Sequence, residues 1–246
     1  MALGGLCWLG GNVLWLLGWA VPDIVWWWAV FLVLTIAAER LELSRLLQPP
    51  PAARLLFAVI LVVLLAGVIG SLSSCPAVWR TMGAGMIMLT IWLLRYDVAR
   101  RTVRMAGLPR FTAVCLLSGY AWLGLAGVGA LVLDDPTAGF GYDAVLHAVF
   151  FGFVFAMVFG HAPIILPAVA RLAVPFRRFF YVPLILLHVA LLLRVAGDVL
   201  AWNEGRMCGG LLGVFAILLF LVSTAVSVRI GRRARTSRTL FPGSPQ

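Results

Sequence analysis

The chain has 246 residues, of which 63% are hydrophobic and only 11% are charged. Soluble domains carry about 25% charged residues, so this composition excludes a soluble globular protein, a disordered chain and a fibrous repeat. What remains is a protein of several membrane-spanning helices. The net charge of +10 comes from 19 arginines and no lysine. We attribute this charge to the topology of the loops, and we expect no nucleic-acid partner.

Eight apolar stretches approach the length of about 20 residues that a membrane helix needs. They cover residues 2–20, 24–38, 55–72, 79–94, 111–133, 144–166, 180–200 and 209–228. The first stretch has no basic region before it, so we interpret it as a span and not as a cleaved signal peptide. The sequence therefore predicts an all-α, polytopic transmembrane bundle of about eight spans. It forms one domain over residues 1–231, and a basic, disordered cytoplasmic tail follows over residues 232–246.

The arginines fall in alternate loops. Sixteen of the 19 are on one predicted side of the membrane. They are Arg40, Arg45 and Arg54; Arg95, Arg100, Arg101, Arg104 and Arg110; Arg171, Arg177 and Arg178; and Arg229, Arg232, Arg233, Arg235 and Arg238. By the positive-inside rule, both termini then lie in the cytoplasm.

All three histidines, His147, His161 and His188, fall in the sixth and seventh spans. An ionisable residue inside a bilayer costs about 2.5 to 3.5 kcal/mol on insertion scales and often marks a functional site. In an ideal helix His147 and His161 would be about 21 Å apart along the axis and about 40° apart around it. They would share a face but not a metal ion. His188 is predicted at about the depth of His161, and the two would face each other if their helices are neighbours.

Charged residues accompany these histidines at helical spacing. Asp143 precedes His147 by four positions, so its carboxylate would orient the imidazole. Arg194 and Asp198 are also four positions apart, the spacing of an ion pair on one helix face. This pair is interpreted as structural, or alternatively as a clamp for a cofactor propionate or as a proton relay.

Neutral imidazole is a ligand that suits copper, zinc and heme iron. Two histidines at matched depth on adjacent helices predict a heme or copper site. The alternative is that each histidine bonds a backbone carbonyl or a serine and only joins helices. Cys75 and Cys208 map to the predicted outer side, where an oxidising environment would allow a disulfide between them.

Two segments of these spans resemble the NnrS family of bacterial membrane proteins. The first runs through His147-Ala148, Gly152-Phe153-Val154, Met157 and Gly160, and the second is Leu186-Leu187-His188-Val189-Ala190-Leu191-Leu192-Leu193-Arg194-Val195. The resemblance covers about residues 141–230. It implies bound heme b, copper or both, a place in the bacterial inner membrane, and a link to nitric oxide metabolism and nitrosative stress. Members of that family have about twelve spans and more histidines than this chain.

Three functions are compatible with these observations. The first is a metal-binding membrane protein of nitrosative or respiratory metabolism, in which His147, His161, His188 and Arg194 hold the cofactor. The second is a transporter or channel for a small solute, with Asp143, Arg194 and Asp198 along the path. The third is a membrane subunit or assembly factor that docks other membrane subunits through its arginine-rich loops. No catalytic residue stands out, so binding, sensing or electron transfer is favoured over an enzymatic reaction.

Overall fold

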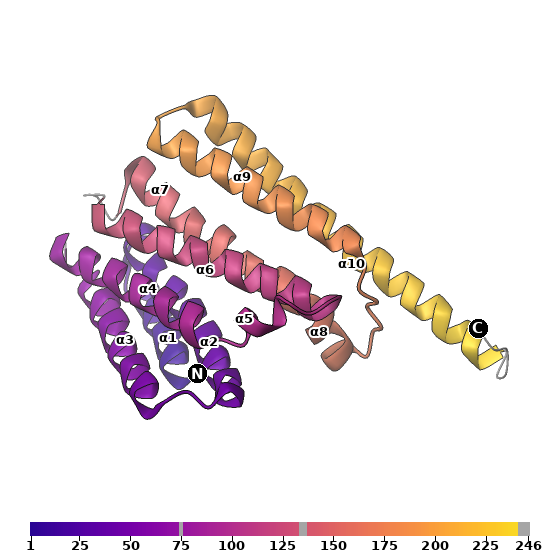
Figure 1. The fold of residues 1–246 in the computed structure, drawn as a ribbon. Helices are drawn as coiled ribbons and strands as arrows, with labels where there is room; N and C mark the ends of the chain where they lie inside the picture. Colours follow the sequence, from indigo (N-terminus) through magenta and orange to yellow (C-terminus); the bar gives the residue numbers. More distant parts are fainter. Residues whose placement is uncertain (74–75, 133–136, 241–246) are drawn as a thin grey trace.

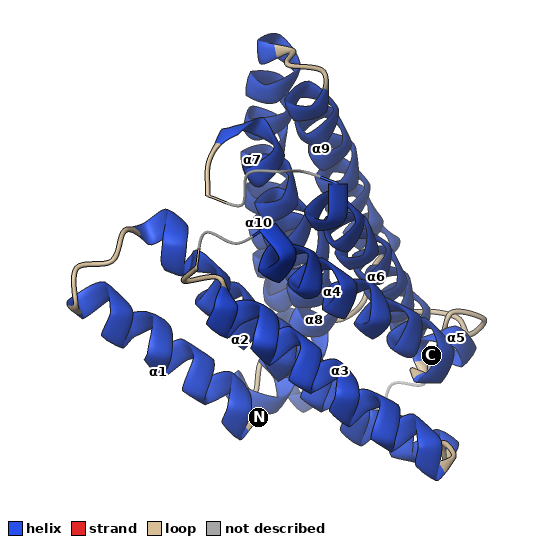
Figure 2. Cartoon of the chain, turned by 90° about the vertical axis from the view of Figure 1, so that its left-hand side faces the viewer, coloured by secondary structure: helices blue, strands red, loops and turns tan. Residues whose placement is uncertain are grey.

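The computed structural model describes residues 1–73, 76–132 and 137–240, with only the backbone described for Pro76 and for residues 233–240. Within these ranges the chain is helical and contains no strand (Figure 2). The main helices are α1 (Ala2–Leu16), α2 (Val21–Ser44), α3 (Pro51–Gly70), α4 (Pro76–Tyr96), α5 (Ala99–Thr102), α6 (Leu108–Val132), α7 (Gly139–His147), α8 (Ala156–Ala170), α9 (Tyr181–Val199) and α10 (Asn203–Leu240). Short 3₁₀ turns η1 (Arg45–Leu47) and η3 (Arg178–Phe180) and a π-helical segment η2 (Ala148–Phe155) complete them.

Seven helical segments of the described chain are long and apolar enough to cross a membrane. They are Val21–Leu47, Pro51–Gly70, Ala77–Tyr96, Leu108–Val132, Gly139–Ala170, Arg178–Val199 and Asn203–Arg232. They match the second to eighth stretches predicted from the sequence. The first stretch forms α1, whose 15 residues extend about 22 Å, less than the roughly 30 Å of a hydrocarbon core. An all-α bundle is confirmed, whereas the count of eight spans and the orientation depend on α1.

Helix α6 lies at the centre of the bundle. It packs against α4 on one side and against α7, η2 and α8 on the other, while α1 and α2 form an antiparallel pair at the edge (Figures 1 and 2). Helices α9 and α10 lie side by side as a hairpin (Figure 1). This α9–α10 hairpin contacts the rest of the bundle mainly through α7 and η2.

Glycines allow the central helices to approach closely. A Cβ added to Gly83 of α4 would lie 2.7 Å from the carbonyl oxygen of Gly127, and one added to Gly127 of α6 would lie 2.8 Å from that of Gly83. The backbones of α4 and α6 therefore touch directly at this crossing. Met82 and Met86 are fully buried nearby, so α4 uses small residues and methionine for helix packing.

The π-helical segment changes the faces of the long helix over residues 139–170. Its i→i+5 hydrogen bonds turn the chain by less than the roughly 100° per residue of an α-helix. The expectation that His147 and His161 share a face is therefore wrong. His147 is directed toward α9 and α10, where it lines a small gap with Arg194 and Gly210, and His161 is directed toward α2, where it contacts Arg40.

Helix α10 extends beyond the last membrane-spanning residues. Its backbone is helical to Leu240, so the predicted domain boundary after residue 231 falls inside the helix. Residues 241–246 of the predicted tail lie outside the described chain.

Candidate functional site

A network of charged side chains joins α7 to the α9–α10 hairpin. The Asp143 carboxylate accepts hydrogen bonds from Arg194 Nη2 at 2.7 Å and from Arg194 Nε at 3.1 Å. Arg206 of α10 donates to Asp198 and also reaches Asp143 Oδ2 at 3.5 Å. The imidazole of His147 has its Nδ1 atom 2.8 Å from the Asp143 carbonyl oxygen and 3.4 Å from its carboxylate. The charges of two arginines and two carboxylates therefore balance each other at one end of the bundle.

The structure revises the ion pairs predicted for this network. The contact between Asp143 and His147 is present, as their spacing indicates. The predicted pair of Arg194 and Asp198 is a long contact of 3.8 Å. The guanidinium of Arg194 instead donates to Asp143, and the guanidinium of Arg206 donates to Asp198. Sequence reasoning assigned Arg206 to a loop and missed this role. It belongs to α10, which gives the network its second cation.

Close backbone contact explains why the two arginines meet. A Cβ added to Gly209 would lie 2.6 Å from the backbone nitrogen of Arg194, and one added to Gly197 would lie 2.6 Å from that of Arg206. Glycine at both positions lets α9 and α10 cross without intervening side chains. The Arg206 guanidinium also lies 4.2 Å above the ring of Phe140. The network is thus a structural junction between the hairpin and the bundle.

His161 and His188 do not face each other, contrary to the sequence prediction. His188 of α9 accepts a hydrogen bond from Trp122 Nε1 at 3.1 Å and lies 2.9 Å from Ser118 Oγ, so both ring nitrogens contact α6. His161 of α8 has its Nδ1 atom 2.7 Å from the Met157 carbonyl oxygen. The two histidines diverge because α8 directs His161 to α2, while α9 directs His188 to α6.

These contacts do not fit a shared heme or copper site. Among the residues that the structure describes, no group of three or more His, Cys, Asp or Glu side chains is placed to hold a metal ion. Both ring nitrogens of His161 and of His188 already have polar neighbours. The predicted disulfide lies outside the described residues, because Cys75 is not among them; Cys208 is exposed on α10.

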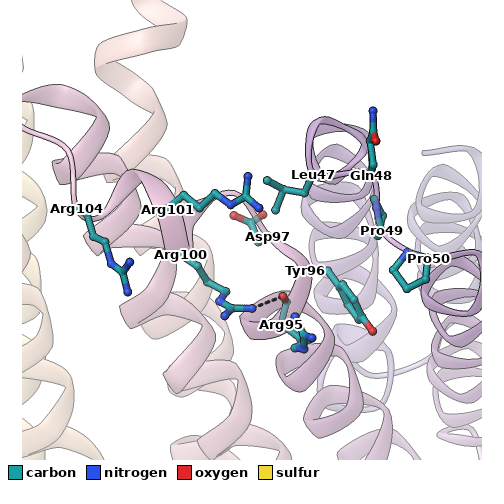
Figure 3. Close-up of a pocket in the computed structure, with 10 residues that line it drawn as sticks. All are labelled: Leu47, Gln48, Pro49, Pro50, Arg95, Tyr96, Asp97, Arg100, Arg101 and Arg104. Carbon is teal, nitrogen blue, oxygen red and sulfur yellow. Dashed lines mark hydrogen bonds between the residues drawn. The ribbon is translucent and has the colours of Figure 1, made fainter.

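A different cluster forms at the opposite end of the bundle, where α2 and α4 end. A cavity of about 410 Å³ opens between the link from η1 to α3 and the junction of α4 with α5 (Figure 3). The link follows from its sequence: Gln48 has a positive φ of 48°, and the prolines after it start α3 at Pro51. The cavity is lined by Leu47, Gln48, Pro49, Pro50, Arg95, Tyr96, Asp97, Arg100, Arg101 and Arg104.

Four arginines of this cavity have no carboxylate partner. None of Arg95, Arg100, Arg101 and Arg104 forms an ion pair with any described residue. Arg100 donates to the backbone carbonyl oxygen of Arg95 at 2.6 Å, the dashed line in Figure 3. All four side chains are exposed. Their guanidinium groups are therefore available to an anion from solution or from the membrane surface.

Asp97 is the only acidic residue that lines this cavity among the described residues, and it forms no ion pair with the arginines. It is 1% exposed, and its Oδ1 atom accepts a hydrogen bond of 2.6 Å from the backbone N–H of Ala99 at the start of α5. Burial raises the pKa of the Asp97 carboxyl above its ordinary 3.8, while the Ala99 N–H and the nearby Arg40 act in the opposite direction. The carboxyl serves the local fold, and the four arginines outnumber it, so the cavity keeps a net positive charge.

Behind Asp97 lies a second, buried polar group. Arg40 of α2 is 4% exposed, and its Nη2 atom donates to Glu39 at 2.6 Å and to His161 Nε2 at 3.1 Å. Since Nε2 accepts from Arg40, the ring proton of His161 is on Nδ1, where it donates to Met157. Sequence reasoning treated Arg40 as a loop residue and did not consider Asp97. A lone acid among the arginines of residues 95–104 was the available signal.

The comparisons with known proteins identify a family without an assigned activity. A family model described as a domain of unknown function (DUF8744) matches residues 1–229. No curated protein and no solved structure matches the chain.

Proposed function

Since the chain belongs to the DUF8744 family, whose function is unknown, we propose from its geometry that it is a multi-pass membrane protein that binds a phosphate-bearing anion. The site is the arginine-lined cavity formed by residues 47–50 and 95–104. The observation that carries the proposal is the set of four arginines around one cavity that have no carboxylate partner in the described part of the chain. It develops the predicted role of the arginine-rich loops in docking a partner.

The chemistry of the cavity favours phosphate over other anions. A guanidinium presents its N–H donors in a planar fork that matches the oxygens of phosphate. Arginines from α4, from α5 and from the segment after it approach the cavity from different directions. A phosphate group has enough oxygens to accept from several of them at once, whereas a halide has a single centre.

The position of the cavity makes a lipid headgroup a natural source of this phosphate. The membrane-spanning parts of α2 and α4 end at Leu47 and Tyr96, which both line the cavity. Arginines at the end of a span are attracted to anionic lipids. In the predicted orientation, the protein lies in a bacterial inner membrane with both termini in the cytoplasm. The cavity would then face the inner leaflet of that membrane. A free phosphate compound presents the same chemistry.

A binding titration tests this proposal. The full chain in a nonionic detergent is titrated with dihexanoyl phosphatidic acid, with inorganic phosphate and with uncharged trihexanoylglycerol, and binding is followed by calorimetry. We expect phosphatidic acid to bind and trihexanoylglycerol not to bind. Binding of inorganic phosphate alone would identify a free compound, and binding of phosphatidic acid alone a lipid headgroup. If neither phosphate probe binds, the proposal is wrong.

A pair of variants assigns the binding to the cavity. Arg101 and Arg104 line it and have no ion pair, so Arg101→Gln/Arg104→Gln removes two donors without disturbing a described contact. Charge-assisted hydrogen bonds contribute about 1.5 to 3 kcal/mol, and we expect Kd to rise about tenfold or more. The matched control, Arg171→Gln/Arg178→Gln, removes two arginines of the same predicted side that do not line the cavity. Equal losses of affinity in both variants would show that the anion responds to the overall positive charge of the protein and not to a site at the cavity.

The other predicted functions have a weaker physical basis. Heme or copper binding at His161 or His188 would require that histidine to give up its present hydrogen bonds. Metal binding at any of the three histidines stays a prediction that an absorption spectrum tests. Transport would require a polar path between the arginine cavity and the network at Asp143. Buried apolar side chains, among them Phe153 and Leu116, occupy the interior between these two ends.

A further inference from the structure

A second cavity lies behind Asp97, separate from the arginine-lined one. It has a volume of about 350 Å³ and is enclosed by the end of α2, by α5, by the start of α6 and by α8. This volume is within the range of small-molecule sites, about 300 to 1,000 Å³. Most of its lining is apolar, with Leu43, Leu46, Leu116 and Ile164 among the residues. A ligand here would have an apolar body.

The opening of this apolar cavity faces the bilayer. Leu46 is 74% exposed and Ile164 is 46% exposed, and both belong to membrane-spanning segments. Exposed apolar side chains in such segments contact lipid. A molecule dissolved in the hydrocarbon region therefore has direct access to the cavity.

The inner wall of the cavity offers one unpaired donor and one unpaired acceptor. Arg40 Nε and Asp97 Oδ2 are buried without a hydrogen-bond partner among the described residues, and both side chains line the cavity. The Tyr120 hydroxyl is a hydrogen-bonding neighbour that lowers the pKa of the Asp97 carboxyl, but in the structure it has no hydrogen bond of normal geometry. A buried polar atom without a partner costs about 1 to 3 kcal/mol, so a ligand that pairs both atoms recovers this cost.

We propose that this cavity binds a lipid-soluble molecule that carries a hydroxyl group on an apolar body. A hydroxyl oxygen accepts from Arg40 Nε and its proton is donated to Asp97 Oδ2, so a hydroxyl combines the two functions that complement these atoms. An ionised carboxylate is disfavoured because Asp97 and Glu39 are acidic, and an ammonium is disfavoured by Arg40. Long-chain alcohols, diacylglycerols and quinols share the required chemistry.

Photolabelling of the full chain tests the site. The probe is a ten-carbon alcohol with a diazirine at its far end, and its control is the methyl ether of the same molecule, which accepts but does not donate. We expect the alcohol to label the end of α2 and the part of α8 around Ile164, and the ether to label them about fivefold less. Equal labelling by the two probes would overturn the proposal.

Neighbouring residues on α8 provide matched variants. Ile164 lines the cavity, whereas Ile165 is similarly exposed and does not. Ile164→Trp fills the opening and is expected to abolish labelling of the α2 end, while Ile165→Trp leaves it unchanged. The same effect of both tryptophans would contradict a site at this cavity.

A polar variant tests the hydroxyl recognition itself. In Asp97→Asn, the amide oxygen still accepts from Ala99, but an N–H donor replaces the acceptor Oδ2. We expect labelling by the alcohol to fall about fivefold. If this variant fails to fold, the comparison at Ile164 and Ile165 still decides the question.

Competition identifies the source of the hydroxyl. Excess 1-decanol, a short-chain diacylglycerol and a decyl-substituted quinol are each added before irradiation of the wild-type protein. Displacement by only one of them assigns the ligand class. If none displaces the label, the labelling is nonspecific and the proposal fails. None of these competitors carries phosphate, so the result is independent of the arginine-lined cavity.

Discussion

Asp143 is predicted to hold the α9–α10 hairpin to the bundle, and Asp143→Asn tests this directly. The carboxylate contacts Arg194 at 2.7 Å and Arg206 at 3.5 Å. Removing one partner of a fully buried pair costs about 3 to 5 kcal/mol. The side chains of Asp143 and Arg194 are 26% and 21% exposed, so partial solvent screening lowers this range, and we expect a loss of about 2 kcal/mol.

The assay is unfolding of the purified chain in mixed detergent micelles, followed by circular dichroism. The matched control is Glu42→Gln, which removes the carboxylate that contacts Arg45 at 3.2 Å, where both side chains are at least 60% exposed. This exposed pair should contribute less than about 0.5 kcal/mol. If Asp143→Asn destabilises the protein no more than Glu42→Gln, the network is not the junction that we describe.

Three further predictions concern the helix packing, the buried carboxyl and the histidines. Gly127→Ala places a methyl group 2.8 Å from a backbone oxygen of α4 and should lower the free energy of unfolding by about 1 to 3 kcal/mol in the same assay. The control Gly5→Ala, with nothing within 4 Å of the added Cβ, should not destabilise the protein. Equal effects of the two variants would contradict the close crossing of α4 and α6. Because burial raises the pKa of Asp97, the folded protein holds this proton to higher pH than the unfolded chain. The free energy of unfolding should therefore fall as the pH rises from 3.8 through the raised pKa. The slope of stability against pH in this range should be smaller in Asp97→Asn, and an unchanged slope would refute the raised pKa of Asp97. His188→Leu leaves Trp122 Nε1 without its acceptor and should cost about 1 to 3 kcal/mol without changing the visible absorption spectrum, and a Soret band lost in this variant would instead establish heme at His188.

Local patterns in the sequence predicted the helices and the contacts within them. Apolar runs of about 20 residues predicted eight spans, and seven of them coincide with helices of the described chain that are long and apolar enough to cross a membrane. Such runs are informative because the backbone of a membrane protein must pair its own hydrogen bonds. The spacing of Asp143 and His147 predicted their contact, since residues four apart share a helix face. Both inferences need only the geometry of one helix.

Contacts between helices escaped the sequence analysis for a physical reason. Arg194 pairs with Asp143, which is 51 positions away, and not with Asp198 on its own helix. The contact of Arg40 with His161 joins residues 121 positions apart. Such pairs depend on which helices are neighbours and on the rotation of each face. The π-helical segment altered that rotation between His147 and His161, and its sequence carries no signal that we recognised.

The arginine-lined cavity was only partly predictable. The arginines of residues 95–104 were visible as a basic loop, but their approach to the link at Gln48 and Pro49 is a tertiary feature. Whether Asp97 pairs with these arginines or is buried and bonded to the backbone N–H of Ala99 is likewise decided by the fold. Composition alone does not distinguish these two cases.

The most direct test of the proposed function is to locate a bound anion in an experimental structure of the full chain. Tungstate is a heavy analogue of phosphate whose position can be determined by anomalous scattering. We expect tungsten among the guanidinium groups of Arg95, Arg101 and Arg104, and not in the Arg101→Gln/Arg104→Gln variant. Tungstate bound only at the arginines of residues 171–178, or nowhere on the chain, would contradict the assignment of the cavity as the anion site.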